Sequence, residues 1–227
     1  MAPDYGRVFP RLREAAGAEW GAYVRHPFVA GLEDGSLPRP AFLAYLVQDY
    51  LFLIHFSRAW ALAVTKADTV AEMRQCAAAV NALVNVEIAL HVETCAGEGL
   101  SEADLEGAEE APATLAYTRY CLDAGAQGDF LDLMAALAPC VLGYGEIGAR
   151  LAPARTEAHP YADWIATYAG EEYQSLAAET GAMIDAAFAR RLGTDWAASP
   201  RWPGLAHRFR VATRLEAAFW QAGLADA

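Results

Sequence analysis

Residues 45–60 read YLVQDYLFLIHFSRAW, and this stretch decides the fold class. If it forms a helix, its apolar residues recur every three or four positions and make one continuous stripe. The stripe consists of Phe42, Tyr45, Leu46, Asp49, Phe52, Leu53, Phe56 and Trp60. The spacing therefore predicts a buried helix, and it places the carboxylate of Asp49 among aromatic rings.

The same helical periodicity continues along the rest of the chain. It predicts helices at about 5–24, 39–67, 69–97, 112–125, 128–151, 160–192 and 203–223. No alternating pattern typical of strands competes with it, and the breaks carry turn and cap residues such as DGSLPRP and the TVAE capping box. We therefore expect an all-α helical bundle. With 227 residues and no linker-like change of composition, we expect a single domain, 1–227.

Composition limits the partners and the compartment. The net charge of −12 argues against binding to nucleic acid or to anionic membrane surfaces, whose phosphates would repel the chain. Charges precede any apolar run at the N-terminus, and charge-free stretches are shorter than the ~18 residues that a membrane span needs. The four cysteines form no CxxC pair, which favours free thiols. We expect a cytoplasmic protein that neither contacts nucleic acid nor enters a membrane.

Asp49 is unusual for a core position. Burial of an isolated carboxylate costs several kcal/mol unless the group is paired, hydrogen-bonded or neutralised. Asp49 is therefore either a site residue or a structural aspartate paired with Arg58, Arg119 or a backbone group. In the first case we expect it to stay unpaired until a ligand binds.

Glu216 interrupts a second aromatic stripe, in LAHRFRVATRLEAAFWQAG at 205–223. It is either a second site carboxylate or a residue at the edge of the stripe, paired with Arg208 or Arg214. Spacing alone leaves both alternatives open.

The segment AALAPCVLGYGEIG, residues 135–148, has features of a cavity wall. Pro139 removes a backbone donor inside a helical pattern and predicts a kink beside Cys140. We expect Gly143 and Gly145 to loosen the packing further. Cys140 is then either a reactive thiol or an inert small apolar residue.

Other candidate side chains have equally ordinary alternatives. Tyr117, Tyr144 and Tyr168 either line a site for a flat ligand or fill the core. Glu87 and His91 have the i, i+4 spacing that presents two metal ligands on one helix face. A dinuclear site normally needs a second such pair, and the chain has none, so we interpret His91 as a satisfied structural histidine and expect no metal.

Seven motifs together resemble one family. They are HPFVAGLEDGSLP (26–38), YLVQDYLFLIHFSRA (45–59), EIALH (87–91), PATLAYTRY (112–120), LAPCVLGYGEIG (137–148), HPYADWIATYAGEEY (159–173) and LEAAFW (215–220). Their order and spacing resemble thiaminase II, the TenA family, over nearly the whole chain. The resemblance implies a haem-oxygenase-like fold, a homotetramer, and no haem, metal or other cofactor.

The resemblance also implies a reaction. Members hydrolyse pyrimidines in thiamin salvage: aminomethyl-pyrimidine (4-amino-5-aminomethyl-2-methylpyrimidine) becomes hydroxymethyl-pyrimidine, and thiamin is cleaved to pyrimidine plus thiazole. Cys140 places the chain in the cysteine-containing branch.

The family's site residues carry over by matching motif. Cys140 corresponds to the nucleophile, Glu216 to the acid–base residue and Asp49 to the group that binds the aminopyrimidine edge. The resemblance places Phe52, Tyr117, Tyr144 and Tyr168 around the substrate. Members often have tyrosine where this chain has Phe52, which keeps a ring for stacking but lacks a hydroxyl.

Three other functions remain as alternatives. One is a haem-oxygenase-like redox enzyme that uses a metal at Glu87 and His91, or a quinone. Another is a non-catalytic carrier that binds pyrimidine or thiamin. The third, suggested by the family's label as a transcriptional activator, is a regulatory interaction protein, although the acidic charge opposes direct contact with DNA. A thiol at Cys140 favours the hydrolase, since a carrier does not need one.

Overall fold

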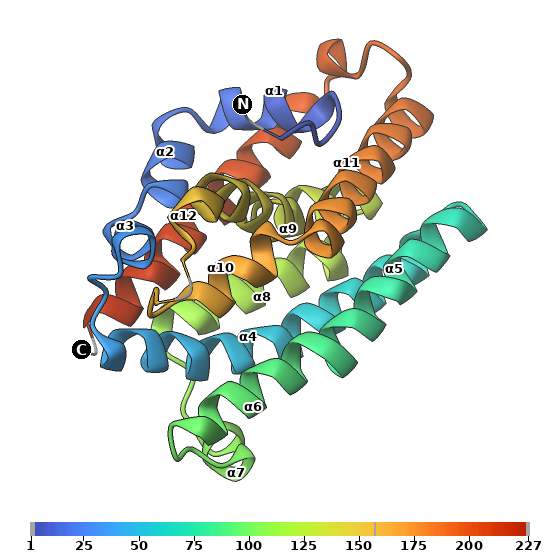
Figure 1. Cartoon of the computed structure of the whole chain (residues 1–227). Helices are drawn as coiled ribbons and strands as arrows, with labels where there is room; N and C mark the ends of the chain where they lie inside the picture. Colours follow the sequence, from blue (N-terminus) through green and yellow to red (C-terminus); the bar gives the residue numbers. More distant parts are fainter. Residues whose placement is uncertain (1–2, 157, 226–227) are drawn as a thin grey trace. The chain divides into compact units, whose positions relative to one another are not determined.

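The computed structural model describes residues 3–156 and 158–225, and every regular element in these ranges is helical (Figure 1). The prediction of an all-α fold is confirmed. The helices are α1 (Val8–Ala16), α2 (Ala18–Val24), α3 (Pro27–Asp34), α4 (Arg39–Lys66), α5 (Val70–Ala82), the π-helical turn η1 (Leu83–Glu87), α6 (Ile88–Gly97), α7 (Glu102–Glu106), α8 (Pro112–Gln127), α9 (Phe130–Leu151), the 3₁₀ turn η2 (Ala152–Ala154), α10 (Ala162–Ala169), α11 (Glu171–Leu192), the 3₁₀ turn η3 (Trp196–Ala198) and α12 (Trp202–Ala225).

Local backbone chemistry explains where the observed helices differ from the predicted ones. The predicted helix 5–24 is divided at Gly17, whose φ of +59° only glycine adopts readily. The predicted helix 160–192 is divided at Gly170, which has extended backbone angles. Periodicity does not detect such breaks, because the apolar spacing continues across them.

Contacts divide the chain into two compact units. The first unit contains Met1–Leu37 and Met134–Ala217, and the second contains Pro38–Leu133 and Ala218–Ala227. The division falls inside α9 and α12. The prediction of a single domain stays a prediction.

The second unit is organised around α4. This 28-residue helix packs against α5, α6 and α8, and all the members of its predicted apolar stripe are buried. α5, η1 and α6 follow one another as one long helical segment beside it (Figure 1). That segment begins at Thr69, whose hydroxyl accepts a hydrogen bond from the Glu72 amide, as the TVAE motif predicts. The glutamate side chain accepts from the Asp68 amide instead of the Thr69 amide.

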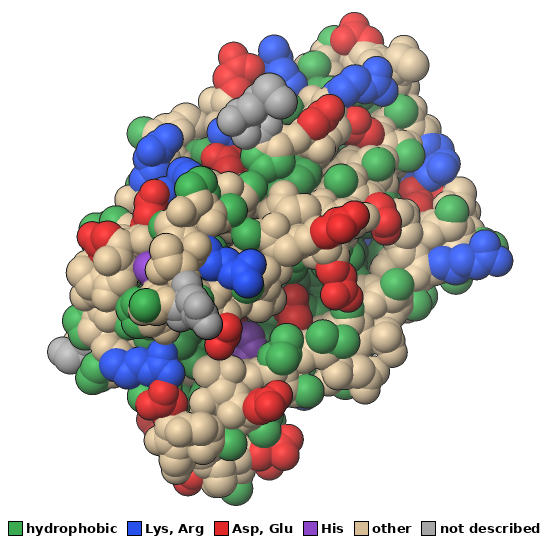
Figure 2. Space-filling model, in the orientation of Figure 1, with side chains coloured by type: hydrophobic (Ala, Val, Ile, Leu, Met, Phe, Trp, Pro, Cys, Tyr) green, Lys and Arg blue, Asp and Glu red, His purple; other side chains and the backbone are tan. Residues whose placement is uncertain are grey.

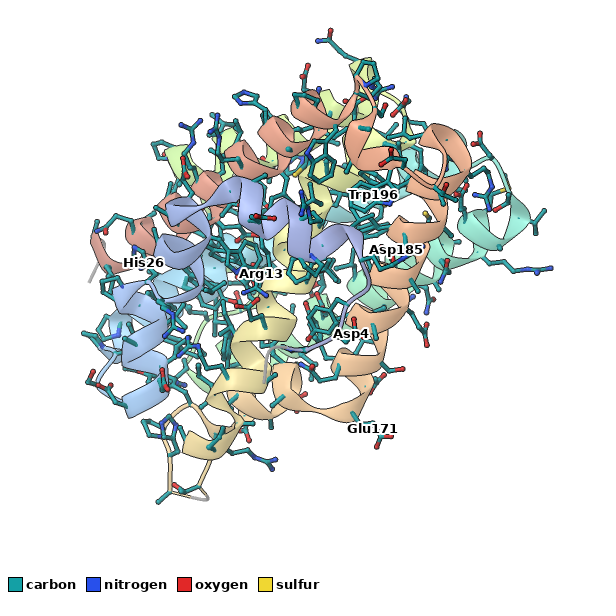
Figure 3. All side chains as sticks on the ribbon, turned by 90° about the horizontal axis from the view of Figure 1, so that it is seen from above. Asp4, Arg13, His26, Glu171, Asp185 and Trp196 are labelled. Atoms are coloured by element: carbon teal, nitrogen blue, oxygen red, sulfur yellow. The ribbon has the colours of Figure 1, made fainter. Side chains whose placement is uncertain are left out.

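In the first unit, polar side chains attach helices that are far apart in the sequence. Asp185 of α11 accepts hydrogen bonds from the Arg7 and Val8 amides at the start of α1 (Figure 3). These amides have no partner within their own helix, and a carboxylate at a helix N-terminus also interacts favourably with the helix dipole. Gln174 of α11 similarly donates to the carbonyls of Gly145 and Tyr168. These bonds fix α10 and α11 to α9, the helix that carries Cys140.

Candidate functional site

Asp49 is buried on α4 and has two partners. The carboxylate oxygen Oδ2 lies 2.8 Å from His91 Nε2 and accepts a hydrogen bond from the Tyr45 hydroxyl at 3.0 Å. Asp49 is 4% exposed and His91 is 8% exposed, so the pair is almost wholly shielded from water. No described residue donates a hydrogen bond to the other oxygen, Oδ1. Both contacts are therefore made to one oxygen, and Oδ1 has no donor among the described residues.

This pairing corrects the expectation that Asp49 stays unpaired in the core until a ligand binds. The structural alternative named Arg58, Arg119 or a backbone group as the partner, and that is also wrong, because the partners are His91 and Tyr45. Arg119 instead forms two hydrogen bonds with Glu110. Sequence spacing gives the face of α4 on which Asp49 lies but not which helix packs against that face.

The hydrogen bonds of His91 determine where its protons lie. Nδ1 is 2.8 Å from the carbonyl oxygen of Glu87, which only accepts, so Nδ1 carries a hydrogen. Burial alone would lower the pKa of His91, but the hydrogen bond to Asp49 and the charge of that carboxylate raise it above its ordinary value. His91 is thus best described as an imidazolium bound to the Asp49 carboxylate. The interpretation of His91 as a satisfied histidine is confirmed.

Glu87 is the third titratable group here. Burial raises its pKa to about 7, the Asp49 charge adds to this, and His91 opposes it. Because the folded pKa lies above the ordinary value of 4.5, the stability that the neutral carboxyl contributes is complete at low pH. That contribution is lost as the pH rises through about 7. The raised pKa of His91 likewise makes its contribution to folding stability larger at low pH than at high pH.

We therefore expect Glu87→Gln to be more stable than the wild type at pH 8 but not at pH 5. A difference of about 1 to 2 kcal/mol in the free energy of unfolding is reasonable for this partly exposed group. Urea unfolding at several pH values measures it. Glu93→Gln, at an exposed position on the adjoining α6, is the control. Equal pH dependence in the wild type and Glu87→Gln would contradict the raised pKa.

Phe52 and Tyr117 form the aromatic part of the second unit's candidate site. Their ring centroids are 5.0 Å apart and their planes are tilted by 32°. Phe52 also stacks on Phe56 one turn further along α4. Phe52 lies three residues after Asp49, so the structure brings three predicted site residues of this unit, Asp49, Phe52 and Tyr117, into one neighbourhood.

Cys140 lies in the first unit, inside α9, and the helix continues through Pro139. It is partly exposed, whereas Cys76, Cys95 and Cys121 are buried. Tyrosine hydroxyls donate to the carbonyl oxygens on either side of it. Tyr23 donates to Pro139 and Tyr173 donates to Val141, both at 3.2 Å. These contacts hold the backbone of α9 in place around the thiol.

The glycines after Cys140 do not loosen the packing, so that expectation is wrong. A Cβ atom at Gly143 would lie 2.4 Å from Tyr23 Cε1, and one at Gly145 would lie 2.5 Å from the Tyr5 hydroxyl. At Gly148 it would lie 2.3 Å from the Tyr168 carbonyl carbon. Each glycine therefore lets another segment of the first unit approach α9 closely.

Tyr144 and Tyr168 are brought together beside this segment. Their ring centroids are 5.0 Å apart, nearly edge to face. Tyr144 lies one turn after Cys140 on α9, and the close approach at Gly148 determines where Tyr168 lies. Both rings are buried, so core filling and ligand contact are both compatible with this position.

Glu216 is buried on α12 with 2% exposure. Burial alone does not distinguish a site carboxylate from one paired with Arg208 or Arg214, so both alternatives stay predictions. Arg214, two residues earlier, is exposed.

Sequence reasoning missed the contacts of Tyr23 and Tyr173 with the backbone beside Cys140, and the contact of His91 with Asp49. For the two tyrosines the sequence contains only a general indication, namely that a buried hydroxyl needs a hydrogen-bond partner. The EIALH motif singled out His91, but its i, i+4 spacing suggested Glu87 as the partner side chain. In the structure the Glu87 backbone, not its carboxylate, bonds the ring.

The chain is similar to known proteins over almost its whole length. The TENA/THI-4/PQQC family matches residues 14–226. An aminopyrimidine aminohydrolase of Halalkalibacterium halodurans is 38% identical over 212 residues, which is 92% of each chain. A crystal structure of a TenA family transcription regulator from Silicibacter sp. TM1040 is 52% identical, covers 97% of both chains and has a TM-score of 0.94.

A solved structure with much lower sequence identity has a similar fold. A domain of unknown function from Shewanella denitrificans with a heme oxygenase-like fold covers 95% of this chain and 91% of its own, at 15% identity and a TM-score of 0.72. The prediction of a haem-oxygenase-like fold is confirmed.

Proposed function

Because this chain belongs to the TENA/THI-4/PQQC family, we propose that it is an aminopyrimidine aminohydrolase, a hydrolase of thiamin salvage. The observation that carries this is the match to the aminopyrimidine aminohydrolase of H. halodurans, which extends over 92% of both chains. The substrates proposed are aminomethyl-pyrimidine and thiamin.

Cys140 is the proposed nucleophile. Its thiolate adds to the electron-poor pyrimidine ring, and the electrons released into the ring expel ammonia, or the thiazole of thiamin, from the attached methylene. Water then adds to the methylene, and departure of the thiolate restores the aromatic ring. The net reaction consumes one water, replaces the amino group by a hydroxyl and releases ammonia.

The two carboxylates have different proposed roles. A thiol has an ordinary pKa near ~8.5, so it needs a proton acceptor at neutral pH, and Glu216 is the proposed group that moves protons among thiol, water and leaving group. Asp49 binds the amino edge of the pyrimidine. Its unbonded Oδ1 supports this role. Phe52, Tyr117, Tyr144 and Tyr168 are the proposed aromatic contacts of the substrate.

The alternatives have less support. A metal bound by His91 would need a ring nitrogen with a free lone pair, but both nitrogens are already directed at oxygen acceptors. The 52% identical structure is titled a transcription regulator, yet acidic side chains are spread over the face drawn in Figure 2 and basic ones do not gather there. A net charge of −12 opposes direct contact with DNA.

Chromatography of reactions with each substrate tests the proposal. We expect hydroxymethyl-pyrimidine from aminomethyl-pyrimidine and from thiamin, and unchanged rates in the presence of a chelator. Binding of either compound without product would favour the carrier. Loss of activity in chelator would favour the redox alternative.

We also propose that the chain assembles as a homotetramer through α5, η1 and α6. Among the described residues, two helical segments, Val70–Gly97 and Phe130–Ala154, are long and apolar enough to cross a membrane. The most apolar part of Phe130–Ala154 is 83% buried inside the protein, whereas that of Val70–Gly97, which comprises α5, η1 and α6, is only 17% buried. Val84, Val86 and Leu90 are each more than 40% exposed. Glu93 and Arg74 lie in the same segment and would be costly in lipid. A second copy of the chain is therefore the better partner.

We expect the double variant Val86→Glu, Leu90→Glu to dissociate into smaller species, because charges would replace apolar contacts between copies. Light scattering after size exclusion measures the mass. Gln221→Glu, at an exposed polar position on α12 outside this segment, adds charge without removing apolar surface and should leave the mass unchanged. A monomeric wild type, or one that associates only with detergent, would contradict the proposed assembly.

A further inference from the structure

Three titratable side chains of the second unit lie close together at the contact between α4 and the η1–α6 segment. Asp49 belongs to α4, Glu87 to η1 and His91 to α6. The imidazole of His91 bridges two oxygens at 2.8 Å each, the Glu87 carbonyl and Asp49 Oδ2. None of the proposed chemical steps uses His91 or Glu87. Burial of the His91 imidazole nevertheless carries a desolvation cost that an apolar side chain would avoid.

The geometry fixes the orientation of the Asp49 carboxylate and its role as an acceptor. His91 and Tyr45 both bind Oδ2, so the carboxylate cannot rotate freely and Oδ1 remains the open acceptor. The imidazole and the Tyr45 hydroxyl both direct hydrogen-bond donors at Oδ2, an arrangement that suits a carboxylate oxygen acting as an acceptor. An ionised carboxylate only accepts hydrogen bonds, whereas a protonated one also donates. The charge state of Asp49 thus decides which ligand edge it can bind.

We propose that His91 is a positioning residue that keeps Asp49 an acceptor-only group and thereby selects 4-aminopyrimidines over 4-oxopyrimidines. The inference rests on the proposed function, in which Asp49 binds the amino edge of the substrate. An exocyclic amino group donates to Oδ1, whereas an exocyclic carbonyl would place two acceptors against each other. Sites built around a buried polar group reject a mismatched ligand strongly, because that group is then left unpaired.

A purely structural role makes a different prediction. If His91 only joined α4 to α6, its loss would reduce the fraction of folded enzyme. The folded remainder would keep the same KM and the same preference between the two ligands. The ratio of affinities for the two ligands is therefore the informative measurement.

The test compares the wild type with His91→Gln and His91→Leu. Glutamine keeps a hydrogen-bond donor but not the charge, and leucine removes both. The control is His55→Gln on the same helix as Asp49, where the partly exposed histidine lies beside Arg58, Arg119 and Glu110. Calorimetry measures affinities for 4-amino-5-hydroxymethyl-2-methylpyrimidine and its 4-oxo analogue, and steady-state assays give KM and kcat.

We expect the wild type and His55→Gln to prefer the amino ligand by about 100-fold or more. His91→Gln should reduce this preference by about 10-fold and raise KM more than it lowers kcat, and His91→Leu should reduce it further. If His91→Leu does not fold, His91→Gln alone decides. An unchanged preference and KM in His91→Gln would overturn the inference while leaving the proposed function intact. A wild type that neither binds nor hydrolyses the pyrimidine would overturn both.

Discussion

Cys140→Ser is expected to fold normally and to lose turnover by about 10³-fold or more, because a hydroxyl is a far poorer nucleophile than a thiolate at neutral pH. The partly exposed side chain tolerates this small change, so the melting temperature should stay near that of the wild type. Steady-state kinetics with aminomethyl-pyrimidine measure the loss. Near-wild-type turnover would remove the covalent mechanism.

Alkylation provides a second measurement on the same thiol. Burial raises the pKa of Cys76 to about 12 and also raises the pKa of Cys95, so neither supplies thiolate at neutral pH. Cys121 is buried as well. Iodoacetamide should therefore modify Cys140 first, with protection by the substrate pyrimidine. Faster labelling of any other cysteine, located by peptide mass spectrometry, would show that the ranking of the thiols is wrong.

Asp49→Asn is expected to lower both ligand affinity and stability. The amide has no charge, so His91 loses the counter-ion of a buried pair, at a cost of about 1 to 3 kcal/mol in the free energy of unfolding. Pyrimidine affinity should fall by about 100-fold, because the amino group loses a charged acceptor. Calorimetric titration and urea unfolding measure the two effects.

The exposed position Asp123, on α8 of the same unit, supplies the control for this change. Asp123→Asn should alter neither affinity nor stability by a measurable amount. If Asp49→Asn is less stable but binds as well as the wild type, Asp49 is structural only. An unpaired aspartate would have predicted a gain in stability, so the His91 contact reverses the expected sign.

The sequence was sufficient for the fold class and for the composition of the α4 stripe. Helical spacing depends only on which residues lie on one face, and that face is buried as predicted. The partner of Asp49 could not be predicted, because His91 is 42 residues away and its approach depends on how α6 packs against α4. Spacing carries no information about contacts between helices.

The surroundings of Cys140 show the same limit. The motif LAPC identifies the thiol, and the proline before Cys140 and the glycines after it suggest an irregular helix. Yet Gly143 serves the close approach of Tyr23, a residue more than a hundred positions away. A glycine that permits tight packing and one that permits looseness look identical in a sequence.

A product assay with aminomethyl-pyrimidine, run on the wild type and on Cys140→Ala side by side, tests the central claim most directly. Circular dichroism first establishes that both proteins are folded. The account predicts hydroxymethyl-pyrimidine and ammonia in equal amounts from the wild type and almost none from Cys140→Ala. Comparable product from both proteins, or none from the folded wild type, would contradict it.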